Sequence, residues 1–257
     1  MGKVIAIANQ KGGVGKTTTS VNLSACLAQA GKKTLTIDID PQGNTSSGLG
    51  INKNSLSATV YEMLLGQCYF EDAVISSKIE NLYVLPSNVE LSGAEIELIG
   101  YENREFLLRE ILKDRKFLYD YIIIDCPPSL NLLTINALSA ADSVLVPIQC
   151  EYYALEGLTQ LLHTIELVKK RLNPKLAFEG VVFTMYDART NLSMEVVEEV
   201  KKHLPKGAFR SVIPRNVRLS EAPSHGVPIT VYDEKSKGAE AYITLAKELI
   251  EHEGRQG

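Results

Sequence analysis

Residues 4–19 read VIAIANQKGGVGKTTT. This stretch begins with five apolar residues, continues through a glycine-rich turn and leads into residues 17–30, which have helical length and composition. Gly31 follows directly and is a common helix stop. A buried strand, a glycine-rich turn and a helix in immediate succession predict the first unit of an α/β protein.

The rest of the chain repeats this order. Short apolar runs predict strands at 34–39, 82–85, 121–124, 144–148, 181–184 and 211–213. Amphipathic stretches between them predict helices at 94–112, 155–172, 192–203 and 239–250. We therefore predict an α/β fold with a doubly wound, mostly parallel sheet and helices on both faces. We expect residues 1–257 to form a single domain, with about 250–257 as a frayed tail.

The composition is that of an ordinary globular protein. The chain has 257 residues, of which 45% are hydrophobic and 23% charged, and its net charge is −4. No apolar run approaches the roughly 18 residues of a membrane span, and the first strand begins too early for a secretory signal. The charge balance by itself argues against binding to nucleic acid.

Cysteine and histidine spacing gives no sign of a metal site. The four cysteines are far apart and form no Cys-x-x-Cys pair, so we expect reduced thiols that pack as small apolar side chains. A cluster that draws cysteines from two subunits stays open as an alternative. The four histidines also lack the spacing of metal ligands.

The glycine-rich turn has the composition of a phosphate-binding loop. Gly12, Gly13 and Gly15 allow the backbone to wrap around an anion, so that successive N–H groups converge on it. The following helix adds the positive end of its dipole. Lys16 is placed to reach the β- and γ-phosphates of a nucleotide, and the Thr17 hydroxyl to bind Mg²⁺ directly.

One position departs from the standard pattern of such loops. The spacing Gly-x-x-x-x-Gly-Lys requires glycine at position 10, where this chain has Gln10. A second lysine, Lys11, precedes Gly12. Because the backbone and Lys16 already cradle the phosphates of the chain's own nucleotide, the charge of Lys11 is available for another use.

Carboxylates follow the strand predicted at 34–39. The carboxyl ends of strands in such sheets face the ligand crevice, so Asp40 can approach a γ-phosphate and orient the attacking water. Pro41 and Gly43 turn the chain directly after it. Asp38 lies two residues earlier, on the same face by the strand period, and we interpret it as a structural residue.

A second carboxylate ends the strand predicted at 121–124. Residues 121–128 read YIIIDCPP, a buried strand that ends in Asp125. An acid at this place typically lies near Mg²⁺ and contacts it through a bound water, the arrangement called Walker B. Pro127 and Pro128 give the following segment the character of a switch.

The motif KGGVGKT at residues 11–17 resembles the deviant Walker A motif of the family that includes ParA, MinD and the nitrogenase iron protein. The resemblance implies that ATP and Mg²⁺ are the cofactors and that Lys11 crosses a sandwich dimer to the partner's phosphates. It also implies that Asp40 and Asp125 contact Mg²⁺ through water. The catalytic residues implied are Lys11, Lys16, Asp40 and Asp125. The implied nucleotide-binding residues of the loop are Lys11, Gly12, Gly13, Val14, Gly15, Lys16, Thr17 and Thr18.

Three further segments closely resemble chromosomal ParA proteins of the Soj type. They are QCEYYALEG at 149–157, TMYDART at 184–190 and VIPRNVRLSEAP at 212–223. The resemblance implies that Arg189 and Arg218 contact the DNA backbone. It also implies additional nucleotide-binding residues, namely Met185, Pro214, Arg215 and Asn216.

Charge is distributed unevenly along the chain. Residues 185–220 contain seven basic and four acidic residues, so this segment carries +3 while the remainder carries −7. A patch of this size is common on a solvated surface. Two such patches brought together in a dimer form a surface that attracts DNA phosphates.

The resemblance implies a switch for chromosome partitioning, in which an ATP-bound homodimer binds double-stranded DNA without sequence specificity. The resemblance further implies that a ParB-type partner protein stimulates slow hydrolysis, which releases the DNA, and that the protein is cytoplasmic and associated with the nucleoid. Because the first strand starts at about residue 4, we expect no appended DNA-reading domain. Two alternatives remain. One is a metabolic ATP-dependent ligase or synthetase related to the dethiobiotin synthetase group, and the other is a MinD-like membrane-positioning ATPase, although the chain ends acidic rather than basic.

Overall fold

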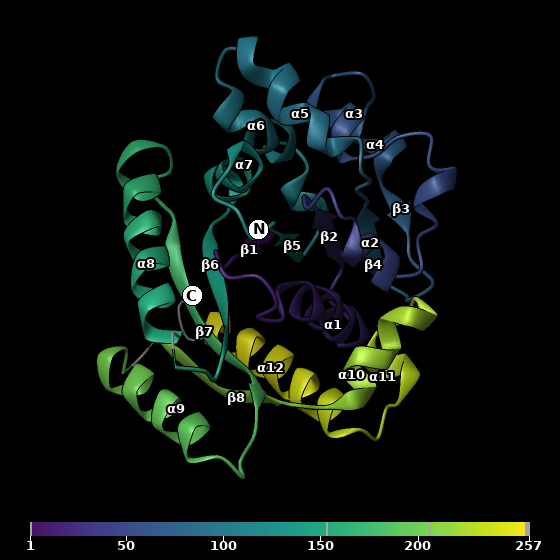
Figure 1. The fold of residues 1–257 in the computed structure, drawn as a ribbon. Helices are drawn as coiled ribbons and strands as arrows, with labels where there is room; N and C mark the ends of the chain where they lie inside the picture. Colours follow the sequence, from purple (N-terminus) through teal and green to yellow (C-terminus); the bar gives the residue numbers. More distant parts are fainter. Residues whose placement is uncertain (1, 153, 206, 255–257) are drawn as a thin grey trace.

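The computed structural model describes residues 2–152, 154–205 and 207–254. Within them, eight strands form one sheet in the order β3-β4-β2-β5-β1-β6-β7-β8, shown in Figure 1. Every neighbouring pair is parallel except β3 and β4. The strands are β1 Lys3–Ile7, β2 Thr34–Asp38, β3 Ile75–Ser76, β4 Leu82–Leu85, β5 Tyr121–Asp125, β6 Ser143–Gln149, β7 Ala177–Tyr186 and β8 Ala208–Pro214.

Helices cover both faces of this sheet. The α-helices are α1 Lys16–Gln29, α2 Asn44–Gly48, α3 Val60–Leu64, α4 Phe70–Ala73, α5 Leu91–Glu97, α6 Leu107–Leu112, α7 Leu132–Ala140, α8 Ala154–Arg171, α9 Asn191–His203, α10 Val217–Glu221, α11 Ile229–Tyr232 and α12 Lys237–Gly254. Short 3-10 turns lie at η1 Lys53–Ser55, η2 Leu98–Gly100, η3 Arg104–Phe106, η4 Lys116–Leu118 and η5 Ala222–His225.

Alternate residues of the central strands pack into different cores. Ile5 and Ile7 of β1 belong to the core that contains α1 and α12, whereas Val4 and Ala6 face the core that contains α7 and α8. Both sets are buried, which explains why the strands read as continuous apolar runs. The predicted doubly wound α/β fold is confirmed.

The strand order places the carboxyl ends of β1, β2 and β5 side by side. In the register of the sheet, Ile7 pairs with Asp125 and Asp38 pairs with Asp125. The chain leaves β1 toward β2 on one side, and β6 lies on its other side. The edge formed by these strand ends therefore lies where the direction of winding changes, which is the place at which ligands bind in open α/β sheets.

The predicted helix at 94–112 is wrong. Helix α5 ends at Glu97 and α6 begins only at Leu107. Between them the chain turns, and Asn103 adopts a left-handed conformation with φ 56°. Amphipathic periodicity continues across this turn, so the sequence pattern did not reveal the break.

Several short elements were missed. They are the two-residue strand β3 and the helices α2, α3, α4, α7, α10 and α11. The predicted end of the last helix is also too early, because α12 continues to Gly254. Its last turn is held by His252, whose ring stacks on Phe209, and by Glu253, which accepts a hydrogen bond of 2.6 Å from the Tyr121 hydroxyl. The remainder of the predicted tail, residues 255–257, lies outside the described residues.

Candidate nucleotide site

The glycine-rich loop curls between β1 and α1 at the carboxyl edge of the sheet. Gly13 and Gly15 have φ angles of 74° and 86°, a left-handed backbone that favours glycine. Two polar contacts fix the loop: the Thr184 hydroxyl donates to the Val14 carbonyl at 2.8 Å, and the Lys11 amide donates to Asn9 Oδ1 at 3.0 Å. Helix α1 begins at Lys16, so its free amides face the concave side of the loop.

Lys16 is a buried cation at the base of this loop. Its ammonium group donates to the Lys11 carbonyl at 3.1 Å. Burial lowers its pKa, and the charges of Asp125, Cys126 and Asp40 oppose that shift. Within the described chain no carboxylate lies within ion-pair distance of its Nζ. A phosphate oxygen bound in the loop would supply the charge partner that Lys16 lacks.

Asp125 is the centre of a buried hydrogen-bond network. Its Oδ2 accepts from the hydroxyls of Thr17 at 2.9 Å and Thr45 at 2.7 Å, and its Oδ1 accepts from Ser20 at 2.8 Å. Burial raises its pKa to about 6, against the effect of these three bonds. Thr45 and Ser20 were not predicted, since neither carries a motif that reveals a partner so distant in sequence.

The described residues offer few oxygen ligands for a magnesium ion. Among the described residues, no group of three or more histidine, cysteine, aspartate or glutamate side chains is placed to hold a metal ion. The Thr17 hydroxyl and the nearby Asp125 carboxylate offer oxygen, the ligand type of Mg²⁺. Mg²⁺ typically keeps several waters and takes its other ligands from phosphates, so this sparse set suits a magnesium–nucleotide complex.

Asp38 and Asp40 occupy different environments. Asp38 is fully buried, and its carboxylate accepts from the amide and hydroxyl of Ser46, at 2.8 and 2.7 Å, and from the Asp40 amide at 3.2 Å. Burial and the charge of Asp125 raise the pKa of Asp38 to about 7. Asp40 follows the strand end and is half-buried, and among the described residues its carboxylate accepts from the Gln42 amide alone, at 2.9 Å. Asp38 therefore holds the turn, as interpreted from the sequence, and Asp40 lies at the rim of the site.

Lys11 forms an ion pair with Glu151, a residue outside the phosphate loop. Its Nζ lies 2.8 Å from Glu151 Oε2, and the two side chains are 41% and 46% exposed. Glu151 also accepts from Gln149 at 2.5 Å. The cradle is thus formed by Lys16 and the backbone, and the charge of Lys11 lies outside it.

A cavity of about 360 Å³ opens directly beside the loop. Gly15 and Thr18 form its loop wall. The four residues outside the loop that were implied to bind nucleotide all line it: Met185, Pro214, Arg215 and Asn216. Sequence reasoning missed its other lining residues, which are Thr184, Ile213, Val217, Leu219, Ser220, Pro223 and Tyr242. Most of these are apolar side chains, for which no spacing indicates a ligand.

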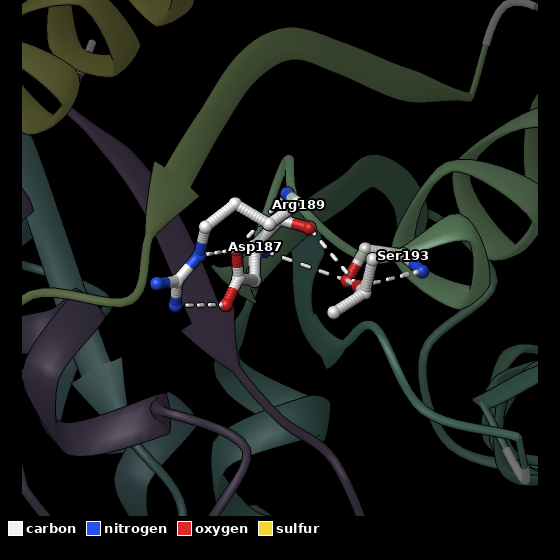
Figure 2. Close-up of polar contacts among 4 residues, drawn as sticks. Asp187, Arg189 and Ser193 are labelled. Carbon is white, nitrogen blue, oxygen red and sulfur yellow. Dashed lines mark hydrogen bonds and ion pairs between the residues drawn. The ribbon is translucent and has the colours of Figure 1, made fainter.

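The two arginines implied to contact DNA follow neighbouring strands. Arg189 lies after β7 and Arg218 lies in α10 after β8. Figure 2 shows the Arg189 guanidinium against the carboxylate of Asp187, with Nη2 to Oδ2 at 2.6 Å. Arg218 Nη1 lies 2.9 Å from Glu221 Oε2 and its Nε 3.5 Å from Asp233 Oδ2. Both arginines are largely exposed, and each is paired with carboxylates of its own chain.

The four cysteines do not pair with one another. All are free, and Cys26, Cys126 and Cys150 are buried. Burial raises the pKa of Cys150 to about 11 and that of Cys26 to about 12. These thiols therefore pack as apolar side chains in the described structure.

Sequence comparison identifies close relatives along the whole chain. The model of the AAA domain family matches residues 2–178. The sporulation initiation inhibitor protein Soj of Bacillus subtilis is 61% identical over 249 residues, which cover 97% of this chain and 98% of that protein. The chromosome partitioning protein ParA of Myxococcus xanthus is 55% identical and covers 98% of this chain and 89% of its own length.

Structural comparison gives the same fold. A crystal structure of cobyrinic acid a,c-diamide synthase from Mycobacterium smegmatis with bound ADP and magnesium has a TM-score of 0.88 at 38% identity, covering 100% of this chain and 97% of the other. The cell division ATPase MinD of Pyrococcus furiosus has a TM-score of 0.81 at 31% identity, covering 98% and 99%. Across the residues that the structure describes, no helix combines the length and apolar character needed to cross a membrane.

Proposed function

The chain belongs to the ParA/Soj family of chromosome-partitioning ATPases, and on that premise we propose that it is an ATP-dependent dimerisation switch. ATP closes two copies face to face, and the closed dimer binds double-stranded DNA without sequence specificity. Hydrolysis of ATP to ADP and phosphate opens the dimer and releases the DNA. The observation that carries the proposal is the outward position of Lys11, whose charge lies beyond its own phosphate cradle and within reach of another molecule.

The nucleotide occupies the loop and the adjoining cavity. Its phosphates bind the amides of residues 12–18 and the buried ammonium of Lys16, and its base lies in the cavity lined by Met185 and residues 214–216. Thr17 binds Mg²⁺ directly, whereas Asp125 and Asp40 contact it through water. When bound, Mg²⁺ neutralises the charge that develops on the phosphates.

The protein contributes to hydrolysis by positioning the reacting groups, and it forms no covalent bond with the nucleotide. Asp40 orients the attacking water, because its half-buried carboxylate is free of the tight network that engages Asp38. Lys11 leaves Glu151 on dimerisation and reaches the phosphates bound to the other subunit. Asp125 holds Thr17 and Thr45 in place, so the loop and the turn after β2 respond together to the nucleotide.

DNA binding uses basic residues that are doubled in the dimer. Arg189 and Arg218 each contact DNA phosphates, a contact type that gives affinity without base readout. A monomer carries only one set of these basic residues on a chain of net charge −4, so it binds DNA weakly. A ParB-type partner protein stimulates hydrolysis, and the protein works in the cytoplasm at the nucleoid.

The test is size-exclusion chromatography with ATP or ADP, with and without double-stranded DNA of random sequence. We expect dimers with ATP only, and co-elution with DNA for these dimers only. The alternative result is a protein that stays monomeric with ATP and hydrolyses it only when a small carboxylate substrate is present. That result would support a metabolic ligase or synthetase. The similarity to cobyrinic acid a,c-diamide synthase is the observation that favours this alternative. ATP-dependent sedimentation with anionic vesicles would support a MinD-like role.

A further inference from the structure

The turn η4 exposes two large apolar side chains next to each other. Phe117 is 62% exposed and Leu118 52%. Both line a groove of about 320 Å³, and Lys116, the preceding residue of the turn, lines a second groove of about 300 Å³. Neighbouring apolar side chains that stay exposed are typical of an interaction site. Residues 32–33 and 109–118, which supply most of the lining of these grooves, are called the η4 surface below.

The η4 surface is the most basic region of the described chain for its size. Residues 109–118 contain four basic and two acidic residues, and residues 32–33 add two lysines. The η4 surface therefore carries +4, although the net charge of the whole chain is −4. The +3 of residues 185–220 is spread over a longer segment. Its cations are Lys32, Lys33, Arg109, Lys113, Arg115 and Lys116.

Half of these cations form ion pairs within the chain. Arg109 and Lys113 share Glu110, at 3.5 and 3.8 Å. Arg115 pairs with Glu71, at 3.2 Å. The other three have no carboxylate within ion-pair distance among the described residues, and they are Lys32, Lys33 and Lys116. Their charges are therefore available to an anionic ligand.

Two carboxylates also line the groove beside Phe117, but both are engaged by their own chain. Asp120 Oδ2 accepts from the Lys33 amide at 2.7 Å. Glu253 accepts from the Tyr121 hydroxyl at 2.6 Å and lies 3.3 Å from the Lys3 ammonium. They reduce the positive potential of the groove without pairing with the ammonium groups of its lysines.

The η4 surface lies at the amino edge of the sheet, opposite to the phosphate loop. The turn η4 comes shortly before β5, and residues 32–33 come directly before β2. The Asp120 amide donates to the Lys33 carbonyl at 2.7 Å, so the two segments meet at this edge. Asp125 ends β5 at the other edge, next to the end of β1. The length of β5 therefore separates the η4 surface from the nucleotide site.

Neither DNA nor the second subunit covers this edge in the proposed dimer. Strands β5, β1, β6, β7 and β8 are parallel, so Arg189 and Arg218, which follow β7 and β8, lie beyond the carboxyl ends of the strands. The phosphate loop, through which ATP joins the two copies, follows the carboxyl end of β1. The η4 surface therefore stays open in the monomer and in the DNA-bound dimer.

Charge and shape together select the class of ligand. DNA offers phosphates to the lysines but leaves Phe117 and Leu118 without apolar partners. A lipid bilayer is flat, whereas the cations of the η4 surface line two separate grooves. A protein segment that carries both carboxylates and apolar side chains satisfies the charge and the apolar contacts at once.

We propose that the η4 surface docks an acidic segment of a partner protein, with apolar side chains among its carboxylates. The apolar side chains pack on Phe117 and Leu118, and the carboxylates pair with the lysines that lack a partner. Docking does not depend on nucleotide, because the whole length of the sheet lies between the two sites. In the dimer, a step that rests on the proposed function, two η4 surfaces face outward, so DNA and two partner segments bind at the same time.

Docking is tested with a fluorescein-labelled helical peptide of leucine and glutamate, by fluorescence anisotropy against the full chain at fixed salt. We expect binding to the wild type, about tenfold weaker binding to Phe117→Ser and about threefold weaker binding to Lys116→Gln. The matched variants Met194→Ser and Lys202→Gln should bind as the wild type does. They replace exposed side chains of α9, which lies at the bottom of Figure 1, whereas α6 lies at the top.

Several results would overturn the docking surface. They are no binding to the wild type, equal losses in the α9 variants, or unchanged affinity in both η4 variants. Vesicles of phosphatidylglycerol that bind the wild type but neither η4 variant would identify a lipid surface instead. A DNA duplex whose affinity falls in Lys116→Gln would identify a nucleic-acid surface. A peptide with lysine in place of every glutamate should not bind through Phe117, and equal binding of that peptide would refute the charge argument.

Independence from nucleotide is measured with the same peptide in ADP, in ATP, and in ATP with unlabelled duplex DNA. We expect equal affinities in all three and two peptides for each ATP-bound dimer. Competition by the duplex, or a tenfold difference between ADP and ATP, would contradict the position of the η4 surface at the outer edge. If ATP forms no dimers, the proposed function fails, whereas the data in ADP still decide whether the η4 surface binds the acidic peptide.

Discussion

Asp187 holds Arg189 through two parallel hydrogen bonds from the guanidinium to the carboxylate. Nε donates to Oδ1 at 2.8 Å and Nη2 to Oδ2 at 2.6 Å, and the Arg189 amide donates to Oδ1 at 3.0 Å, as Figure 2 shows. These bonds hold the pKa of Asp187 far below its usual range. The arginine proposed to contact DNA is therefore engaged by its own chain at neutral pH, although its side chain is 86% exposed.

The substitution Asp187→Asn should raise the DNA affinity of the ATP-bound protein. A neutral amide at this position cannot hold the guanidinium with two charged bonds, so Arg189 becomes available for a phosphate. We expect a dissociation constant about fivefold lower, measured by anisotropy of a labelled duplex at fixed salt. The matched control Glu195→Gln removes one charge from α9 without releasing an arginine, and an equal gain in that variant would contradict the prediction.

Removing both arginines should abolish DNA binding while ATP-driven dimers remain. For Arg189→Ala with Arg218→Ala, we expect affinity to fall by about a hundredfold and the slope of log K against log salt to decrease by about two per subunit. The dimer is measured by size exclusion with ATP, and DNA affinity by anisotropy. The control is Lys113→Ala with Lys175→Ala, two exposed lysines elsewhere. An unchanged salt slope in the arginine variant would refute the patch.

Gly12→Val should separate ATP binding from dimerisation. A Cβ added at Gly12 meets no atom of the described residues beyond its chain neighbours within 4 Å, so the loop of the monomer has room for a side chain. In the proposed dimer, its bulk would instead enter the space that the second subunit needs. We expect ATP binding by calorimetry close to that of the wild type and a monomer in size exclusion, with Gly12→Ala as the milder control. A valine variant that dimerises as well as the wild type would show that this space is not an interface.

Asp40→Ala should stop hydrolysis and preserve the ATP-bound dimer. Within the part of the chain that the structure describes, the Asp40 carboxylate has one hydrogen-bond partner, the Gln42 amide, so its loss should disturb the turn little. We expect phosphate release to fall by at least about a hundredfold, because no other described carboxylate at the rim replaces its role in orienting water. Asp114→Ala, an exposed carboxylate elsewhere, is the control. Hydrolysis at the wild-type rate would remove Asp40 from its proposed role.

The buried carboxyl pair predicts a pH dependence of stability. The pKa of Asp38 is raised to about 7 and that of Asp125 to about 6, chiefly by burial. The folded chain holds protons that the unfolded chain has released, so the free energy of unfolding falls as pH rises from about 4 to about 7. We expect the Tm of the nucleotide-free protein to fall over this range, measured by calorimetry at constant ionic strength.

The substitution Asp38→Asn tests whether the buried carboxyl pair causes the pH dependence of stability. Without the ionisable group at position 38, the fall in Tm between about pH 4 and pH 7 should become shallower. The exposed control Glu166→Gln should keep the wild-type slope. Equal slopes in all three proteins would place the pH dependence elsewhere in the chain.

The phosphate loop could be predicted from the sequence because its chemistry is contiguous. The glycines, Lys16 and Thr17 lie within a few residues of one another, so the strand, turn and helix can be identified without any long-range contact. The strands were predicted for a similar reason, since burial on both faces requires an uninterrupted run of apolar residues. The break between α5 and α6 was not predicted, because the local periodicity of apolar residues continues through a turn made by Gly100 and Asn103.

The sequence by itself determined the α/β class, the phosphate loop and the carboxylates at the strand ends. Only the tertiary structure decided which distant side chains complete the site. Thr45 and Ser20 reach Asp125 across 80 and 105 residues, and Glu151 reaches Lys11 across 140. Sheet order and register create these contacts by aligning strands far apart in the chain, and no local pattern of residues records which strand becomes the neighbour of which.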